Sequence, residues 1–326
     1  MKICVYGAGA VGGLMAAWLS RAGHDVSVVA RGAHLEAIRK QGLRVRDRAS
    51  GRVDTFTVST TPSGPQDYVF VVVKAQNLTE VASGIEELLG RDTTIVTAMN
   101  GVPWWFFDRL KFGDGKHRLE SLDPGGALSR AMPTESIVGC VIHFAASTPE
   151  PGLISHNMGK RLILGEPGGK NTGRTQRIVA ALGEAGFEAE ATDAIEKEFW
   201  VKLLGNVSFN PVSALTVSTA DRLIRDPLVK AYMVGIMREV LAIGRAVGVD
   251  AAIDPEARID MARQLGKFKT STLQDLEAGK PLEVDGLLAG TLEIAEKAGV
   301  PAPLTQSLFG LVRTRAESTG QYKKTT

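Results

Sequence analysis

The chain has 326 residues, more than one compact domain usually contains, so we expect two domains. It is 44% hydrophobic and 23% charged, as is typical of globular proteins, and its net charge of +2 excludes the basic field of a nucleic-acid-binding protein. The most apolar long stretch, residues 228–249, is interrupted by lysine, arginine and glutamate, which excludes a membrane-spanning helix.

The opening of the chain carries a glycine-rich motif. A short apolar strand, residues 2–6, precedes it, and a helix over residues 11–22 follows. Strand, GxGxxG and helix in this order are the fingerprint of dinucleotide binding: Gly7 permits the tight turn, Gly9 lets the backbone approach a pyrophosphate, and Gly12 lets the helix pack against the strand. The predicted cofactor-binding residues of the motif are Gly7, Ala8, Gly9, Ala10, Val11 and Gly12.

A second strand, residues 25–30, ends at Arg31. NAD enzymes place an acid near this point against the ribose hydroxyls, whereas an arginine suits a 2′-phosphate. The sequence therefore predicts NADPH (or NADP) as the cofactor, with Arg31 among its ligands. A solvated surface arginine is the alternative interpretation of this residue.

Alternating strand and helix patterns continue to about residue 100 and predict a doubly wound sheet of the α/β class. The strands are continuous apolar runs, as in a parallel sheet covered on both faces. The further strands are predicted at residues 68–73 and 93–98, the helices at 33–40 and 79–89, and a pair of short strands within 44–58.

Polar residues follow two of these strands. Lys74 follows the run that ends at Val73, and Asn100 follows the run that ends near Ala98. Ligands of open α/β sheets bind beyond the carboxyl ends of the strands, so we expect both side chains to face the crevice of the glycine motif. A solvated loop lysine and an Asn-Gly turn without a ligand are the alternatives.

Residues 111–134 are rich in glycine, proline and charge and are predicted to form a long loop. A second group of strands is predicted at 137–145, 152–156, 161–164 and 187–191, with a helix at 172–185. From about residue 193 the pattern is helical. We therefore predict a Rossmann-type NADP-binding domain over residues 1–192 and an all-helical catalytic domain over residues 193–326.

The two cysteines, Cys4 and Cys140, both fall in apolar, strand-like runs. Two cysteines are too few for a disulfide framework, and neither has metal-ligand spacing to a histidine, so we expect no metal site. This cysteine usage fits a reducing compartment, and we expect a cytoplasmic protein.

The helix predicted around residues 196–210 carries Lys202, Asn206 and Asn210 at i, i+4 and i+8, so the three share one face. Pro211 is expected to bend or end this helix. The polar face is either the wall of a cleft or an outer polar stripe. Later in the chain, Glu283 stands between apolar residues and is a candidate buried carboxylate, or else a surface residue at a helix start.

These motifs occur in an order that resembles the ketopantoate reductases (2-dehydropantoate 2-reductases). The matching segments are Gly7–Gly12, Val73–Ala75, Asn100–Val102, His156–Glu166, Trp200–Asn206, Asn210–Pro211, Ser271–Leu276 and Glu283–Asp285. They cover nearly the whole chain. The resemblance implies NADPH-dependent reduction of 2-dehydropantoate to pantoate, a step toward pantothenate, by hydride transfer to the 2-oxo group of a small-molecule substrate.

The resemblance also implies a role for each matching residue. Lys202 would be the general acid that protonates the ketone oxygen, and Glu283 would hold a substrate hydroxyl and position the ketone. The substrate-binding residues would be Asn100, Asn206, Asn210 and Ser271, with Ser271 on the carboxylate; Asn100 would also contact the nicotinamide, and Lys74 and Arg31 would hold the cofactor. The helical domain could also form a homodimer.

The run Trp104-Trp105-Phe106-Phe107 departs from the family pattern. It is either core packing or the lining of a more apolar pocket. A reshaped pocket would favour a second hypothesis, the same chemistry on a bulkier 2-oxo acid or ketone. A third hypothesis, a catalytically silent NADPH-binding sensor, is disfavoured because Lys202 and Glu283 are both present.

Overall fold

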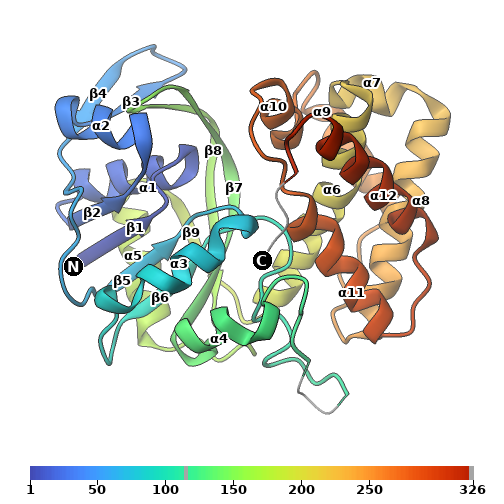
Figure 1. Cartoon of the computed structure of the whole chain (residues 1–326), viewed down its shortest axis with the longest axis horizontal. Coiled ribbons are helices and arrows are strands. Elements are labelled where there is room, and N and C mark those ends of the chain that lie inside the picture. The colour runs from blue at the N-terminus through green and yellow to red at the C-terminus, as the bar shows by residue number, and fades with distance from the viewer. Residues whose placement is uncertain (114–116, 323–326) are drawn as a thin grey trace. The chain divides into compact units, whose positions relative to one another are not determined.

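The computed structural model describes residues 1–113 and 117–322, and within them the chain divides into two compact units (Figure 1). The α/β unit comprises Met1–Val73, Asn77–Met99 and Ala127–Ile195. The helical unit comprises Lys74–Gln76, Asn100–Gly126 and Glu196–Thr326. The predicted α/β class, with a Rossmann-type N-terminal part and a helical C-terminal part, is confirmed.

A mixed β-sheet forms the centre of the α/β unit, with the strand order β2-β1-β5-β6-β7-β8-β3-β4 and with β9 paired to β8. Its first four strands in this order are mutually parallel and confirm four predicted strands: β2 (Asp25–Val29), β1 (Lys2–Tyr6), β5 (Tyr68–Val71) and β6 (Thr94–Thr97). Every residue of β5 and β6 is buried, as a parallel sheet covered on both faces requires. Cys4 and Cys140 are both buried in this sheet.

The remaining strands are arranged around one long hairpin. β7 (Ile137–Glu150) and β8 (Leu153–Gly165) pair antiparallel, and β3 (Leu43–Asp47) and β4 (Val53–Phe56) form the predicted short pair. The prediction of separate strands at 152–156 and 161–164 is wrong, because β8 is continuous. Its first half pairs with β3 and its second half with β9 (Glu188–Ala191), while its exposed, polar middle interrupts the apolar pattern.

The helices of the α/β unit are α1 (Ala10–Arg21), α2 (Gly32–Gln41), α3 (Leu78–Gly84), α4 (Ala127–Ala131) and α5 (Gly173–Ala185). α1 buries Leu14 and Met15 in the core of the sheet. α3 is shorter than predicted, since residues 86–88 form a separate 3₁₀ turn. The loop predicted for 111–134 is interrupted by α4, whose Leu128 is buried.

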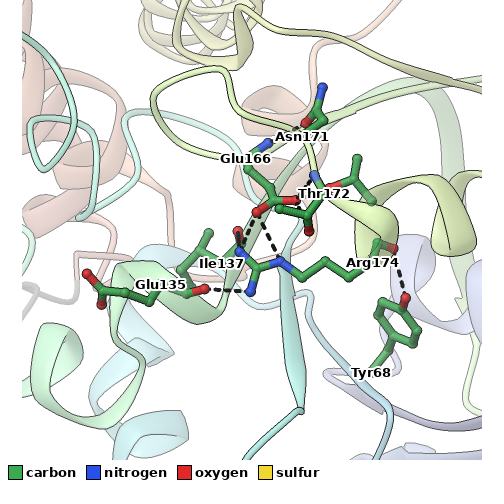
Figure 2. A network of polar contacts seen from close by, with 8 residues as sticks. Tyr68, Glu135, Ile137, Glu166, Asn171, Thr172 and Arg174 are labelled. Carbon is green, nitrogen blue, oxygen red and sulfur yellow. Dashed lines mark hydrogen bonds and ion pairs between the residues drawn. The ribbon is translucent and has the colours of Figure 1, made fainter.

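A buried polar network fixes the start of α5 (Figure 2). Glu166 is 5% exposed and accepts hydrogen bonds from the Thr172 N–H and the Thr175 hydroxyl, each at 2.7 Å. Arg174 donates its Nε–H to the same carboxylate at 3.1 Å, and the Tyr68 hydroxyl donates to the Arg174 carbonyl at 2.8 Å. Burial opposes ionisation, but the hydrogen bonds from Arg174, Thr172 and Thr175 outweigh it and hold the pKa of Glu166 below its ordinary value.

The helical unit is built from α6 (Ile195–Thr216), α7 (Ala220–Arg225), α8 (Pro227–Ala246), α9 (Pro255–Gln264), α10 (Ser271–Glu277), α11 (Gly290–Lys297) and α12 (Pro303–Ser318) (Figure 1). α8 contacts α7, α9, α11 and α12. The prediction that Pro211 could end α6 is wrong: the helix continues to Thr216, and Val212 and Ala214 anchor this last part in the core. No helix in the described ranges is long and apolar enough to cross a membrane.

The aromatic run of residues 104–107 is buried, with every residue at most 1% exposed, and Phe106 and Phe107 belong to the core of the helical unit. Phe106 stacks on Trp200 of α6 at a ring distance of 5.3 Å, and Trp105 packs edge-on against Phe199 at 5.5 Å. These contacts decide between the two interpretations of the run in favour of core packing. The hypothesis of a bulkier substrate thereby loses the observation that suggested it.

Candidate functional site

The glycine-rich motif forms the loop between β1 and α1. Gly7 has φ +107°, and a Cβ there would lie 2.4 Å from the Val72 carbonyl oxygen. A Cβ at Gly12 would lie 2.2 Å from the Gly7 carbonyl oxygen, whereas a Cβ at Gly9 would have no atom within 4 Å. The loop is therefore packed tightly at both ends and open at Gly9, where α1 begins. This geometry fits the pyrophosphate of a dinucleotide.

Two neighbours hold the loop in place. The N–H groups of Gly7 and Ala8 donate to the Val29 carbonyl of β2 at 3.0 and 3.1 Å. From α2, the Nδ1 of His34 accepts a hydrogen bond from the Gly152 N–H at 3.0 Å, so its Nε2 carries the proton and donates to the Ala8 carbonyl at 2.7 Å. His34 was not predicted from the sequence, because both of its partners are distant in the chain.

Arg31 lies at the N-cap of α2, directly after β2. Its guanidinium forms an ion pair with Glu80, and both side chains are more than half exposed. An exposed ion pair contributes little to stability. Arg31 can therefore exchange this carboxylate for a phosphate, and its role in cofactor binding stays a prediction.

The helical unit contains the predicted catalytic pair. Glu283 is 8% exposed, and its Oε1 accepts a hydrogen bond from the Ala75 N–H at 3.1 Å. Burial raises the pKa of this carboxyl above its ordinary value; the Ala75 N–H and the positive charges of Lys74 and Lys202 oppose the rise. Lys202 of α6 and Glu283 are thus close enough for their charges to interact.

Lys74 belongs to the same surroundings. Its Nζ donates to Asp275 Oδ2 of α10 and to the Pro281 carbonyl, each at 2.8 Å. Asp275 lies in one of the segments that resemble the family, but the sequence analysis gave it no role. The predicted contact of Lys74 with the cofactor stays a prediction, since the structure shows its ammonium held by these two groups.

Asn100 begins a segment that packs against a π-helical turn, Asp285–Ala289. The Val102 N–H donates to the Gly286 carbonyl at 3.2 Å. Between them Gly101 has φ +82°, and a Cβ there would lie 2.1 Å from the same carbonyl oxygen. This close approach places Asn100 beside the turn that follows Glu283. Such π-helical turns recur at functional sites.

The other predicted substrate ligands lie on α6 and α10. Asn210 is 8% exposed, and its Nδ2 lies 3.4 Å from the Ser271 Oγ. Thr270 caps α10 by accepting a hydrogen bond from the Leu273 N–H, and its hydroxyl donates to Ser213 of α6 at 3.1 Å. Asn206, half-buried, lies one turn before Asn210. The structure therefore brings Asn210 and Ser271 together.

Comparisons with known proteins identify the family of the chain. A model described as "Ketopantoate reductase PanE/ApbA" matches residues 3–111, and the corresponding C-terminal model matches residues 194–316. A Mesorhizobium japonicum protein named 2-dehydropantoate 2-reductase is 41% identical over 99% of this chain and 100% of its own. The chain belongs to the ketopantoate reductase family. The resemblance drawn from the motifs is confirmed, and with it an oxidoreductase that uses a nicotinamide cofactor.

Several solved structures are similar to this member of the ketopantoate reductase family. A Ralstonia solanacearum protein, provisionally named a ketopantoate reductase, has a TM-score of 0.94 at 47% identity and covers 98% of this chain and 99% of its own. A family member from Ralstonia eutropha has a TM-score of 0.83 at 27% identity and covers 98% and 100%. D-mandelate dehydrogenase bound to NADH shares the fold, with a TM-score of 0.82 at 18% identity over 98% and 100%.

Proposed function

We propose that this protein reduces the 2-oxo group of 2-dehydropantoate to give pantoate, with NADPH as the hydride donor. The observation that carries the proposal is the buried carboxyl of Glu283, which accepts a hydrogen bond from the Ala75 N–H and whose pKa, raised by burial, is lowered in part by the positive charge of Lys202. The name of the 41% identical relative supplies the substrate. The assigned roles of Lys202, Glu283, Asn100, Asn206, Asn210 and Ser271 are part of the proposal.

Lys202 acts as the general acid. The bound nicotinamide supplies a hydride to the ketone carbon. As negative charge develops on the ketone oxygen, the Lys202 ammonium stabilises it and transfers a proton to it, leaving the alcohol. The Glu283 carboxylate attracts the same ammonium and accepts a hydrogen bond from a substrate hydroxyl, which keeps the ketone oriented.

The cofactor is held by the loop of residues 7–12, with Arg31 on the 2′-phosphate and Lys74 as a further ligand. Support for the loop comes from the open space at Gly9. Support for NADPH over NADH comes from the exposed position of Arg31 after β2. The proposal further includes a cytoplasmic enzyme and a main domain division at residues 192 and 193, to which the helical unit adds residues 74–76 and 100–126. It also includes a homodimer, and light scattering of the purified protein would test that oligomeric state.

The deciding experiment follows NADPH absorbance with 2-dehydropantoate beside a panel of aliphatic and aromatic 2-oxo acids. Saturable oxidation with 2-dehydropantoate in preference to the others supports the proposal. Turnover of a bulkier 2-oxo acid alone would assign the same chemistry to another substrate. Silence with every substrate, with NADPH still bound, would overturn the enzymatic function and favour a sensor.

A further inference from the structure

Arg258 of α9 packs directly on the helix that carries Lys202. A Cβ at Gly205 of α6 would lie 2.8 Å from Arg258 Nη2 and 3.4 Å from its Cζ, so the guanidinium lies on the bare backbone of Gly205. Residues three apart on a helix are neighbours on its surface. Gly205 is three residues after Lys202 and directly precedes Asn206. The guanidinium therefore lies at the border of the polar face of α6.

The charge of Arg258 has no visible counterpart within the helical unit. Its Nε is buried, and none of the described residues accepts a hydrogen bond from it. No acid within residues 1–113 or 117–322 forms an ion pair with Arg258, and the pKa of its guanidinium is lowered by burial. On the same helix Arg263 is exposed and paired with Asp260 at 3.1 Å. A buried donor without a partner is costly, and within the described part of the chain the half-buried guanidinium of Arg258 has both an unsatisfied Nε–H and an unpaired charge to offer an anionic ligand.

We propose that Arg258 binds the carboxylate of the 2-oxo acid substrate and thereby selects acids over neutral ketones. This inference rests on the proposed function. A guanidinium offers parallel N–H donors that match the two oxygens of a carboxylate. In a 2-oxo acid the carboxylate carbon is bonded to the ketone carbon. A cation at Gly205 can therefore hold the acid group while Lys202, one helical turn away, serves the ketone oxygen.

Ser271 was assigned the carboxylate by family resemblance. Its hydroxyl is neutral, exposed and already close to Asn210. A neutral hydroxyl cannot discriminate an anion from an amide of the same shape as strongly as a guanidinium can. Arg258 supplies that charge, and Ser271 adds a neutral hydrogen bond to the same carboxylate.

Gly205 has a specific part in this arrangement. Its missing side chain provides the space in which the guanidinium lies, and the atom that a Cβ would meet is the end of a flexible side chain. Gly205→Ala should therefore push the guanidinium aside without straining the backbone. Because alanine favours a helix more than glycine does, the melting temperature should not fall.

The test compares Arg258→Met, Arg258→Lys and Gly205→Ala with Arg263→Met as the matched control on α9. KM and kcat are measured at saturating NADPH for 2-dehydropantoate and for its primary amide. Arg258→Met and Gly205→Ala should raise KM for the acid roughly 10- to 150-fold, the value of a charged hydrogen bond, and change KM for the amide little. Arg258→Lys should lie between, and Arg263→Met should match the wild type. Equal shifts for acid and amide, or none, would overturn the proposal.

Calorimetric titration with oxamate, an unreactive analogue of a 2-oxo acid, separates this inference from the proposed function. If the wild type reduces no 2-oxo acid, the proposed function fails, and oxamate still decides on Arg258. Binding that Arg258→Met weakens by the same factor supports the carboxylate site. Oxamate binding that is unchanged in Arg258→Met, or a fall in its melting temperature without loss of acid selectivity, makes Arg258 a structural residue and contradicts the inference.

Discussion

Lys202 and Glu283 are the proposed catalytic residues of the helical unit. Lys202→Ala removes both the proton donor and the positive charge at the developing alkoxide, so we expect kcat to fall by about 10²–10⁴. The KM for NADPH should remain near the wild-type value. Steady-state kinetics with 2-dehydropantoate check this, with the exposed Lys197 of α6, changed to alanine, as the control. Near-normal turnover of Lys202→Ala would remove Lys202 from the mechanism.

Arg31 offers a test of cofactor choice. Arg31→Ala should raise KM for NADPH by about 10- to 100-fold and leave KM for NADH nearly unchanged, because only NADPH carries the 2′-phosphate. Glu80→Gln should have the opposite sign for NADPH, since it releases the guanidinium from its present ion pair. Equal changes for both cofactors in Arg31→Ala would show that Arg31 does not read the phosphate.

At the scale of elements, α5 depends on a carboxylate that lies outside it. Glu166→Ala leaves Arg174 without its acid and the Thr172 N–H, directly before α5, without its acceptor (Figure 2). Breaking such a buried pair should cost about 3–5 kcal/mol of the free energy of unfolding. Urea denaturation measures it. Glu190→Ala, which breaks the exposed pair with Arg161, is the control and should cost less than about 1 kcal/mol.

Local patterns predict the elements well where one environment covers the whole element. The strand β5 is buried throughout and β1 is buried at its three central residues, and their apolar runs reveal them. β8 pairs with β3 in its first half and with β9 in its second half, and its middle is exposed. The polar residues of this middle interrupt the apolar pattern, so the sequence predicts two strands instead of one. α6 continues through Pro211 because core contacts beyond the proline outweigh the lost hydrogen bond, and no local rule contains those contacts.

At the scale of the whole molecule, two buried glutamates give opposite pH dependences. The folded-state pKa of Glu283 is raised. Its contribution to the free energy of unfolding is therefore fully present below the ordinary carboxyl pKa and is lost as pH rises through the raised value. Glu166, with a lowered pKa, contributes above the ordinary value and loses this stability as pH falls.

These signs lead to a thermal-scanning experiment. Glutamine retains an oxygen for the Ala75 N–H but carries no charge. The melting temperature of Glu283→Gln relative to the wild type should therefore rise steadily from acidic to neutral pH. Glu166→Gln should show a deficit that grows over the same range. A Glu283→Gln curve parallel to that of the wild type would show that the buried carboxyl does not resist ionisation.

Some features of the candidate site can be predicted from contiguous sequence, and others depend on contacts between distant residues. The loop of residues 7–12 is predicted correctly as a motif because strand, turn and helix are contiguous. Lys74 and Asp275 are 201 residues apart, and neither residue indicates the other in the sequence. His34 contacts the backbone of Ala8, and Arg258 lies against the backbone of Gly205. Both contacts join residues distant in the chain, so the local sequence does not indicate them.

The helical unit takes in residues 74–76 and 100–126 from the first half of the chain. This arrangement limits how genes of related proteins can recombine. A gene exchange with a single joint near residue 193 would pair the Phe106 of one parent with the Trp200 of the other, and would likewise join Gly101 and Gly286 from different parents. Each hybrid would have to repack these contacts. Cofactor preference can therefore change more readily by point substitutions. It can also change by double crossovers that keep residues 100–126 together with the helices of the same parent.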